Sequence, residues 1–203
     1  LGNLAWQVKD YEQAVIHHKD AIAVRIELNQ TTLLGDSYNN LGVIYRNFQQ
    51  WPEAHNYLYQ ALDIYEQHYG KSHPFDGGVK NNLALVEENL FKWEKAESLL
   101  QEALSSAQNS YGKFHSQSIK IMRNIAFYYD RRHQFDQSLE MWQQIVTAHK
   151  ANNESNDYIN AIGYKALVHK DIRQFDTAKQ LHQESLELYD KSELVNTVNN
   201  IKP

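Results

Sequence analysis

The amino-acid sequence predicts an all-α fold in which several two-helix units stack side by side to form a solenoid. Two observations predict this fold: a pattern of apolar, small and aromatic residues that recurs five times along the 203 residues, and a spacing that is constant inside every copy. The composition agrees, since the chain has only 3 prolines and 8 glycines, too few for the tight turns of an all-β protein. We therefore expect helices joined by short turns throughout the chain.

Five segments of the sequence align with one another. In every segment, 13 positions separate the first residue from a small residue that ends the segment, and the step from one copy to the next is 40, 42, 42 and 40 residues. A hairpin of two packed helices requires a constant internal spacing because its helices must stay in register, whereas the connection to the next hairpin can vary. The five segments run from Leu1 to Ala14, Leu41 to Ala54, Leu83 to Ala96, Ile125 to Ser138 and Lys165 to Ala178.

Each copy has the chemistry of two antiparallel helices. A small residue recurs where the helix backbones must approach closely, and an aromatic residue recurs at the turn, where its ring would wedge the hairpin. The small residues are Gly2, Gly42, Ala84, Ala126 and Ala166, and the aromatic residues are Tyr11, Trp51, Trp93, Phe135 and Phe175. One hairpin cannot bury its apolar face alone, so neighbouring hairpins are expected to stack.

These repeated positions resemble the tetratricopeptide repeat, and the resemblance covers essentially the whole chain. The turn Tyr69-Gly70-Lys71-Ser72-His73-Pro74 is similar to that of the 42-residue repeats in kinesin light chains and many bacterial repeat proteins. The resemblance implies a right-handed superhelical solenoid of about five hairpins. We expect the repeats at residues 1–30, 33–70, 76–110, 115–150 and 156–190, followed by a capping helix or the start of a sixth repeat at 192–201.

The same pattern predicts two helices in each repeat. They are expected at residues 1–8 and 11–28, 34–48 and 51–68, 77–90 and 93–109, 116–132 and 135–150, and 156–171 and 175–190. Because Leu1 already has the character of a residue in the middle of a helix, we expect the chain to be a fragment of a longer protein.

Composition and motifs argue against several functions. The formal net charge of -5 argues against a general nucleic-acid binder, which needs a basic surface. The chain contains no cysteine, and its 10 histidines form no HExxH motif or carboxylate–histidine cluster, so we expect no metal and no cofactor. It also lacks a Gly-x-Ser-x-Gly elbow and glycine-rich phosphate loops, so we expect no catalysis. No apolar run approaches the roughly 18 residues that cross a bilayer, and we expect a cytoplasmic location.

The resemblance implies that the first helix of each hairpin lines a concave groove in which ligands lie. Asparagine occupies one position in three successive first helices, at Asn40, Asn82 and Asn124. An amide both donates and accepts hydrogen bonds, which suits the clamping of an extended peptide. The alternative is that these amides bond to neighbouring helices and hold the solenoid together. The expected ligand-binding residues of the second and third repeats are Asn39, Asn40, Val43, Arg46, Asn47, Asn81, Asn82, Leu85 and Asn89.

The fourth repeat adds a cationic face to this groove. Residues three, four, seven and eight positions apart share one face of a helix, and that spacing joins Lys120, Arg123, Asn124, Phe127 and Arg131. A guanidinium binds carboxylates bidentately, and an aromatic ring beside it can seat an apolar side chain. We expect a pocket for an acidic or carboxylate-bearing segment, the alternative being a solvated charged face.

Two acidic residues of the preceding repeat would make the charge of this groove uneven. Glu87 and Glu88 follow the asparagine positions of the third repeat, and they favour a ligand that has its own charge pattern.

These observations favour a non-catalytic scaffold that binds a protein or peptide. Two alternatives remain: a regulatory sensor switched by a bound peptide or effector, and a substrate-docking domain of a larger enzyme. We expect a partner that is a protein or peptide rather than a nucleic acid, and association with a second copy of the chain is left open.

Overall fold

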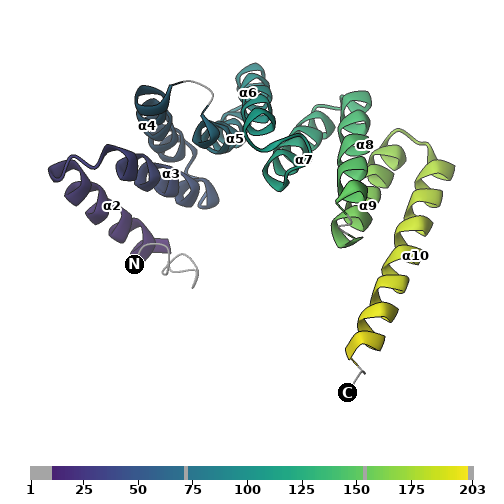
Figure 1. Cartoon of the computed structure of the whole chain (residues 1–203). Helices are drawn as coiled ribbons and strands as arrows, with labels where there is room; N and C mark the ends of the chain where they lie inside the picture. The colour runs from purple at the N-terminus through teal and green to yellow at the C-terminus, as the bar shows by residue number, and fades with distance from the viewer. Residues whose placement is uncertain (1–10, 71–72, 153–154, 201–203) are drawn as a thin grey trace. The chain divides into compact units, whose positions relative to one another are not determined.

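The computed structural model describes residues 11–70, 73–152 and 155–200, and within these ranges all regular secondary structure is α-helical (Figure 1). The helices are α2 (Tyr11–Glu27), α3 (Thr31–Asn47), α4 (Trp51–Tyr69), α5 (Pro74–Asn89), α6 (Trp93–Tyr111), α7 (Ser116–Arg131), α8 (Phe135–Ala151), α9 (Ser155–Asp171) and α10 (Phe175–Asn200). The helix predicted at residues 1–8 lies outside the described residues. The expected boundaries of the other helices agree to within about three residues, except at the end of α10.

The chain divides into two compact units, Leu1–Ser110 and Tyr111–Pro203. In the first unit α3 packs against α2 and α4, and α4 packs against α5. In the second unit α8 packs against α7 and α9, and α9 packs against α10. Within each unit these successive helices are therefore neighbours in space, as the repeat pattern predicts.

Small residues permit the close packing inside a hairpin. A Cβ atom built on Gly42 of α3 would lie 2.5 Å from Cγ of Leu58 on α4, a distance that no real side chain tolerates. Ala54 and Leu58 are themselves fully buried. At this position, the small residue predicted in the first helix is therefore required by the close approach of the two helices.

The turn after each first helix places a residue in the left-handed region of backbone space. Gln49, Phe91, His133 and Arg173 have φ values between 57° and 62°. In each turn the following backbone N–H donates to a carbonyl five residues earlier, for example from Gln50 to the oxygen of Tyr45 at 2.9 Å. This is the Schellman arrangement that satisfies carbonyls at a helix end. The constant spacing of the repeat follows from this one turn geometry.

The end of the chain differs from the prediction. Helix α10 continues without a break from Phe175 to Asn200, so residues 192–200 extend the second helix of the last hairpin and form no separate capping helix. The physical reason is that this stretch contains neither proline nor glycine, the residues that most often stop a helix.

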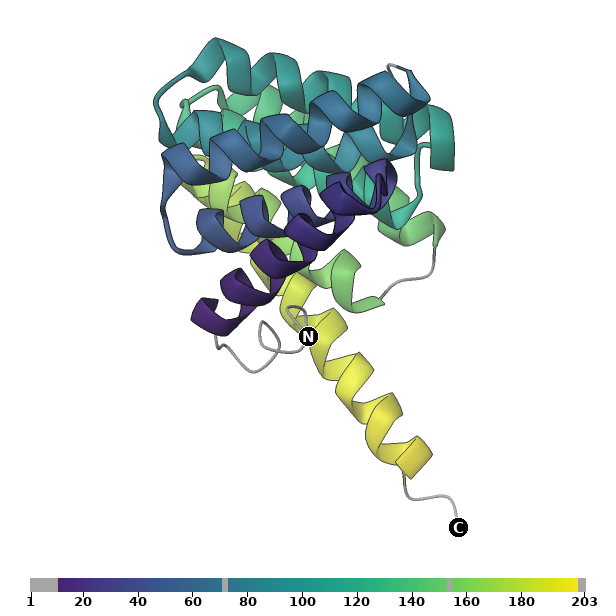
Figure 2. The same ribbon diagram turned by 90° about the vertical axis from the view of Figure 1, so that its left-hand side faces the viewer.

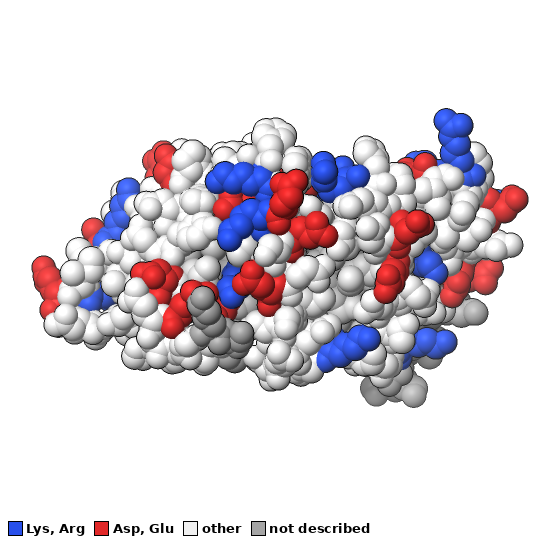
Figure 3. Space-filling view, turned by 90° about the horizontal axis from the view of Figure 1, so that it is seen from above, with Lys and Arg blue, Asp and Glu red and all other residues white. Residues whose placement is uncertain are grey.

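None of the helices in the described part of the chain combines the length and the apolar character that a membrane span requires. Acidic and basic side chains are interspersed on the face drawn in Figure 3.

Candidate functional site

Four of the predicted ligand-binding residues form one hydrogen-bonded chain between α3 and α5. The Nδ2 atom of Asn82 donates to Oδ1 of Asn39 at 3.2 Å. Arg46 donates from Nη1 to Oδ1 of Asn82 at 2.8 Å and from Nη2 to Oδ1 of Asn47 at 3.2 Å. These amides therefore link neighbouring first helices, as the structural alternative requires. Each amide keeps further donor and acceptor capacity, because a primary amide has two N–H groups and two lone pairs.

Arg46 supplies a half-buried positive charge to this chain. Burial lowers the pKa of the Arg46 guanidinium from its ordinary value, although an arginine remains charged in any case. Its hydrogen bonds in the described part of the chain go to amide oxygens rather than to a carboxylate. The charge of Arg46 is thus solvated by neutral groups, and a ligand carboxylate could approach it favourably.

The other predicted residues of the first unit differ in accessibility. Asn81 is only 4% exposed, and Asn89 donates from Nδ2 to the backbone oxygen of Leu85, one turn earlier, at 2.7 Å. Asn40 is partly buried and, together with Asn39, lines a cavity of about 720 Å³ between α2 and α3. Val43 and Leu85 are also partly buried.

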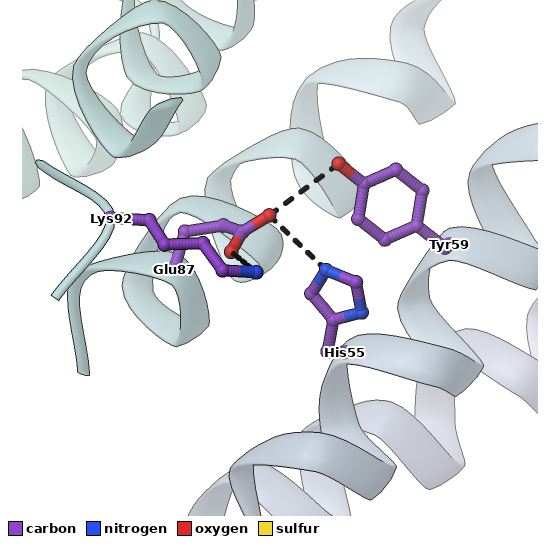
Figure 4. Close-up of polar contacts among 4 residues, drawn as sticks. All are labelled: His55, Tyr59, Glu87 and Lys92. Carbon is purple, nitrogen blue, oxygen red and sulfur yellow. Dashed lines mark hydrogen bonds and ion pairs between the residues drawn. The ribbon is translucent and has the colours of Figure 1, made fainter. Parts of the chain in front are cut away.

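The expectation that Glu87 and Glu88 make the charge of the groove uneven is wrong, because both side chains are buried. Their exposed fractions are 2% and 5%. Figure 4 shows Glu87 of α5 at the centre of a polar network. Its Oε1 atom contacts Nε2 of His55 at 3.2 Å and accepts from the hydroxyl of Tyr59 at 3.4 Å, and its Oε2 atom pairs with Nζ of Lys92 at 3.0 Å. The network joins α4, α5 and the turn that follows α5.

The Glu87 network has an electrostatic consequence for Tyr59. Burial, followed by the nearby charge of Glu87 and the hydrogen bond to it, raises the pKa of the Tyr59 hydroxyl. The phenol therefore stays protonated and continues to donate to the carboxylate. Sequence reasoning missed this network because the carboxylate occupies a position of α5 that helical spacing alone does not mark as buried.

A second buried charge on α5 lies two turns before Glu87. Lys80 is 6% exposed and pairs with Glu66 of α4 at 3.6 Å and with Glu102 of α6 at 3.1 Å. Although burial would raise the pKa of Glu102, the hydrogen bond from Lys80 and its positive charge lower it below the ordinary value. Helix α5 is thus held between α4 and α6 by ion pairs as well as by apolar contacts.

In the second unit the predicted cations lie on the surface of α7. Lys120, Arg123 and Arg131 are exposed, while Asn124 and Phe127 are partly buried. Within the described residues, Lys120 and Arg123 form no hydrogen bond or ion pair with other side chains. Arg131 lies near Asp130 and lowers its pKa, against the larger effect of burial, which raises it. Of the three predicted cations of α7, Lys120 and Arg123 are therefore the two without a side-chain partner among the described residues.

Phe127 belongs to an aromatic cluster that sequence reasoning did not assemble. Its ring centroid lies 5.2 Å from that of Trp142 on α8 and 5.1 Å from that of Tyr164 on α9, both edge to face, and Trp142 and Tyr164 stack at 4.9 Å. Trp142 is 1% exposed, whereas Tyr164 is 38% exposed. Tyr164 stands where the fifth repeat continues the column of Asn40, Asn82 and Asn124, and that alignment could have identified it.

The chain belongs to the tetratricopeptide repeat family. Two models of this repeat match residues 34–75 and residues 78–151, which together make up more than half of the chain. The predicted family and the predicted all-α repeat solenoid are therefore confirmed. The family is generally a non-catalytic scaffold for protein interactions.

Solved structures of other proteins share this fold. BtubC (BKLC) from P. vanneervenii has 20% sequence identity and a TM-score of 0.86, over 100% of this chain and 80% of that chain. A putative kinesin light chain with nearly identical TPR-like repeats, from Podosopora anserina, has 17% identity and a TM-score of 0.82, over 95% of this chain and 93% of that chain. A Rap protein complexed with Competence and Sporulation Factor has 16% identity and a TM-score of 0.74, over 95% of this chain and 53% of that chain. Among curated proteins, none matches the sequence as a relative.

Proposed function

We propose that this chain is a non-catalytic scaffold that binds a protein or peptide along the first helices of its hairpins, and that the bound segment is acidic or bears a free carboxylate. The observation that carries the proposal is the surface of α7. Lys120 and Arg123 are exposed without side-chain partners among the described residues, on the helix whose Phe127 contacts the half-exposed ring of Tyr164. Cations without internal partners beside an aromatic surface favour a carboxylate next to an apolar side chain.

The first unit supports the same class of ligand. Arg46 is held by amide oxygens alone, so its charge is oriented but not neutralised. The remaining hydrogen-bonding capacity of Asn39 and Asn82 suits the backbone of an extended segment. The Rap protein of similar fold was crystallised with a separate factor bound, which agrees with a binding role for this architecture.

The proposal is tested by selecting ligands from a phage-displayed library of random peptides against the 203-residue chain. We expect the selected peptides to be enriched in aspartate and glutamate. Their affinity, measured by fluorescence anisotropy, should fall about tenfold, equivalent to about 1.4 kcal/mol, in the double variant Lys120→Ala/Arg123→Ala.

Two comparisons make this test decisive. The matched control Lys150→Ala removes an exposed cation from α8 of the same unit and should leave affinity within about twofold, since isolated surface charges contribute little. Peptides without acidic enrichment, or equal affinity for the double variant and the wild type, would reject the cationic pocket. A second double variant, Arg123→Ala/Arg131→Ala, should behave like the first, with helicity and melting temperature little changed.

A further inference from the structure

The aromatic ring of Tyr164 on α9 has one face that its aromatic neighbours leave open. The ring centroids of Phe127, Trp142 and Tyr164 form a nearly equilateral triangle, with sides of 5.2, 5.1 and 4.9 Å. Because Trp142 and Tyr164 are stacked, a third ring at equal distances from both lies beside the pair and not on its outer face. Neither neighbour therefore covers the face of Tyr164 that points away from Trp142, and 38% of Tyr164 is exposed.

The exposed ring lies on the side of α9 that faces the preceding repeat, because Tyr164 contacts Phe127 of α7. Helix α10, yellow in Figure 2, packs against another side of α9. There the hydroxyl of Ser185 donates to the backbone oxygen of Ile159 at 3.3 Å, and a Cβ atom built on Gly163 would lie 4.0 Å from that hydroxyl. A repeat that followed α10 would pack on the side of α9 opposite to α7. The open face of Tyr164 is therefore a feature of the contact between α7 and α9, and both helices are described.

Repeat correspondence places a cation beside this ring. Two repeats further along the chain, Arg123 holds the position of Asn39, and Tyr164 holds that of Asn82. In the first unit these two positions are in direct contact, since Nδ2 of Asn82 donates to Oδ1 of Asn39 at 3.2 Å. In the second unit they hold a guanidinium without a side-chain partner among the described residues and a ring with an open face. We therefore expect the guanidinium of Arg123 and the ring of Tyr164 to be neighbours.

The ring of Tyr164 is held in place from behind. It stacks on Trp142 of α8, which is only 1% exposed and is fixed by the packing of the core. The next residue of each helix adds a polar tie, since Nζ of Lys165 donates to Oε1 of Gln143 at 2.7 Å. A side chain that is already fixed loses little conformational entropy when a ligand binds. Tyr164 is thus a preorganised surface for a second flat group.

A single ligand residue can use both features. A guanidinium binds a carboxylate through two parallel hydrogen bonds, and an aromatic ring stacks on another in an offset arrangement. Because the equivalent positions in the first unit are in direct contact, the two features lie within reach of one residue. The residue that carries a ring together with a carboxylate is an aromatic residue at the carboxyl end of a polypeptide.

We infer that Tyr164 is a ligand-binding residue, and that the ligand ends in an aromatic residue whose ring stacks on Tyr164 and whose terminal carboxylate binds Arg123. The inference rests on the proposed function, since it specifies the ligand of the same site. Trp142 acts through Tyr164 and is a positioning residue.

The inference is tested with short glycine–serine peptides that carry fluorescein at the amino end and tryptophan at the carboxyl end. Fluorescence anisotropy with the complete 203-residue chain should show saturable binding. A peptide with the same sequence and a terminal amide lacks the carboxylate, and a peptide that ends in alanine lacks the ring. Each should bind at least about tenfold more weakly than the peptide with both groups.

Variants of the chain assign each half of the contact. Tyr164→Leu keeps an apolar side chain but removes the flat ring, and it should weaken the peptide that ends in tryptophan about tenfold, whereas Tyr164→Phe should restore most of this loss. In Arg123→Ala the free acid and the amide should bind equally, because the partner of the carboxylate is gone. The matched control Tyr189→Leu changes a tyrosine of α10 that is 52% exposed and should bind normally.

Three outcomes would overturn the inference. They are equal binding of the peptides that end in tryptophan and in alanine, equal binding of the acid and the amide to the wild type, and tighter binding of an amidated peptide whose aspartate precedes an internal tryptophan. None of these comparisons requires a variant of the chain, so they hold even if Tyr164→Leu disturbs folding. The proposed function would survive such a failure if acidic peptides from the library still lose affinity in Lys120→Ala/Arg123→Ala, and it would fail with the inference if they do not.

Discussion

The first helices of the two units differ in how their polar side chains are paired. In the first unit, Asn82 joins Asn39 and Arg46 in a chain of hydrogen bonds. In the second unit, Lys120 and Arg123 stand on the surface without side-chain partners among the described residues, and the column position of the fifth repeat is held by the half-exposed Tyr164. The polar side chains of the first helices are thus paired with one another in the first unit, whereas two cations of α7 in the second unit have no side-chain partner among the described residues.

The comparison also concerns how buried groups are supported. In the first unit, Lys80 and Glu87 bring ion pairs into the contacts between α4, α5 and α6. In the second unit, the side chains of Phe127, Trp142 and Tyr164 make aromatic contacts between α7, α8 and α9. The stability that ion pairs contribute depends on pH, whereas the stability that aromatic contacts contribute depends on packing. Substitutions in the two units should therefore change the free energy of unfolding by different amounts and with different pH dependence.

The largest effect is expected from Trp142→Ala in the second unit. The side chain is 1% exposed and contacts both Phe127 and Tyr164, so its removal leaves a cavity. We expect the free energy of unfolding to fall by about 3–5 kcal/mol, measured by urea denaturation. Tyr164→Ala removes the exposed member of the same cluster and should cost much less; equal costs would contradict a core role for Trp142 alone.

A smaller loss is expected from Asn82→Ala in the first unit. The substitution removes the acceptor of Arg46 and the donor to Asn39, leaving a half-buried guanidinium with fewer partners. We expect a loss of about 1–2 kcal/mol in the free energy of unfolding. Asn47→Ala, which removes an exposed acceptor of the same guanidinium, should have little effect. If neither variant changes stability, the amide chain does not hold α3 and α5 together.

The third prediction concerns Asp130 of the second unit. Burial, followed by the charge of Asp171, raises the pKa of Asp130 above its ordinary value of 3.8, with Arg131 and His133 partly opposing. The folded state therefore binds the proton more tightly than the unfolded state, and ionisation of Asp130 costs stability above the folded-state pKa. We expect Asp130→Asn to be more stable than the wild type at neutral pH.

The pH dependence checks that sign. The advantage of Asp130→Asn should shrink as the pH falls through the raised pKa toward the ordinary value, because the wild-type residue is then protonated as well. Urea midpoints of both proteins at neutral and acidic pH measure the difference, with Asp190→Asn as a control at an exposed position. An advantage that persists unchanged in acid would show that charge is not its cause.

The smallest effect is expected from Glu102→Gln in the first unit. Unlike Asp130→Asn, this substitution should lower the stability at neutral pH. Despite burial, Lys80 lowers the pKa of Glu102, so the ionised residue contributes stability that is present above the unfolded pKa and is lost as the pH falls through the folded pKa. The side chain is 50% exposed, and the expected loss at neutral pH is only a few tenths of a kcal/mol. Chemical denaturation should show the wild type and the variant converging in acid.

Sequence spacing predicted the helices of the hairpins because one local turn geometry repeats. Residues such as Gln49 and His133 adopt the left-handed conformation at the same point after each first helix. The aromatic residue that begins the second helix therefore always follows the end of the first helix by the same number of residues. The length of α10 was not predicted, because repeat similarity suggested a new element where no helix-breaking residue stands.

The candidate site was predicted only in part. Helical spacing grouped Lys120, Arg123 and Phe127, which all lie on α7, because residues three, four and seven positions apart share a face of one helix. Spacing within one helix does not tell which neighbouring helix covers that face. For this reason Glu87 was expected at the surface although it is buried against His55 and Lys92, and Tyr164 of α9 was overlooked as the partner of Phe127.

The sequence by itself determined the fold class, the register of each hairpin and the positions of the small residues, because these depend on periodicities that are local to one or two helices. Only the tertiary structure decided which polar side chains are paired, which are buried and which remain available. The physical reason is that a hydrogen bond or an ion pair requires two groups about 3 Å apart, and residues such as Arg46 and Asn82, 36 positions apart, come within that distance only when neighbouring hairpins pack.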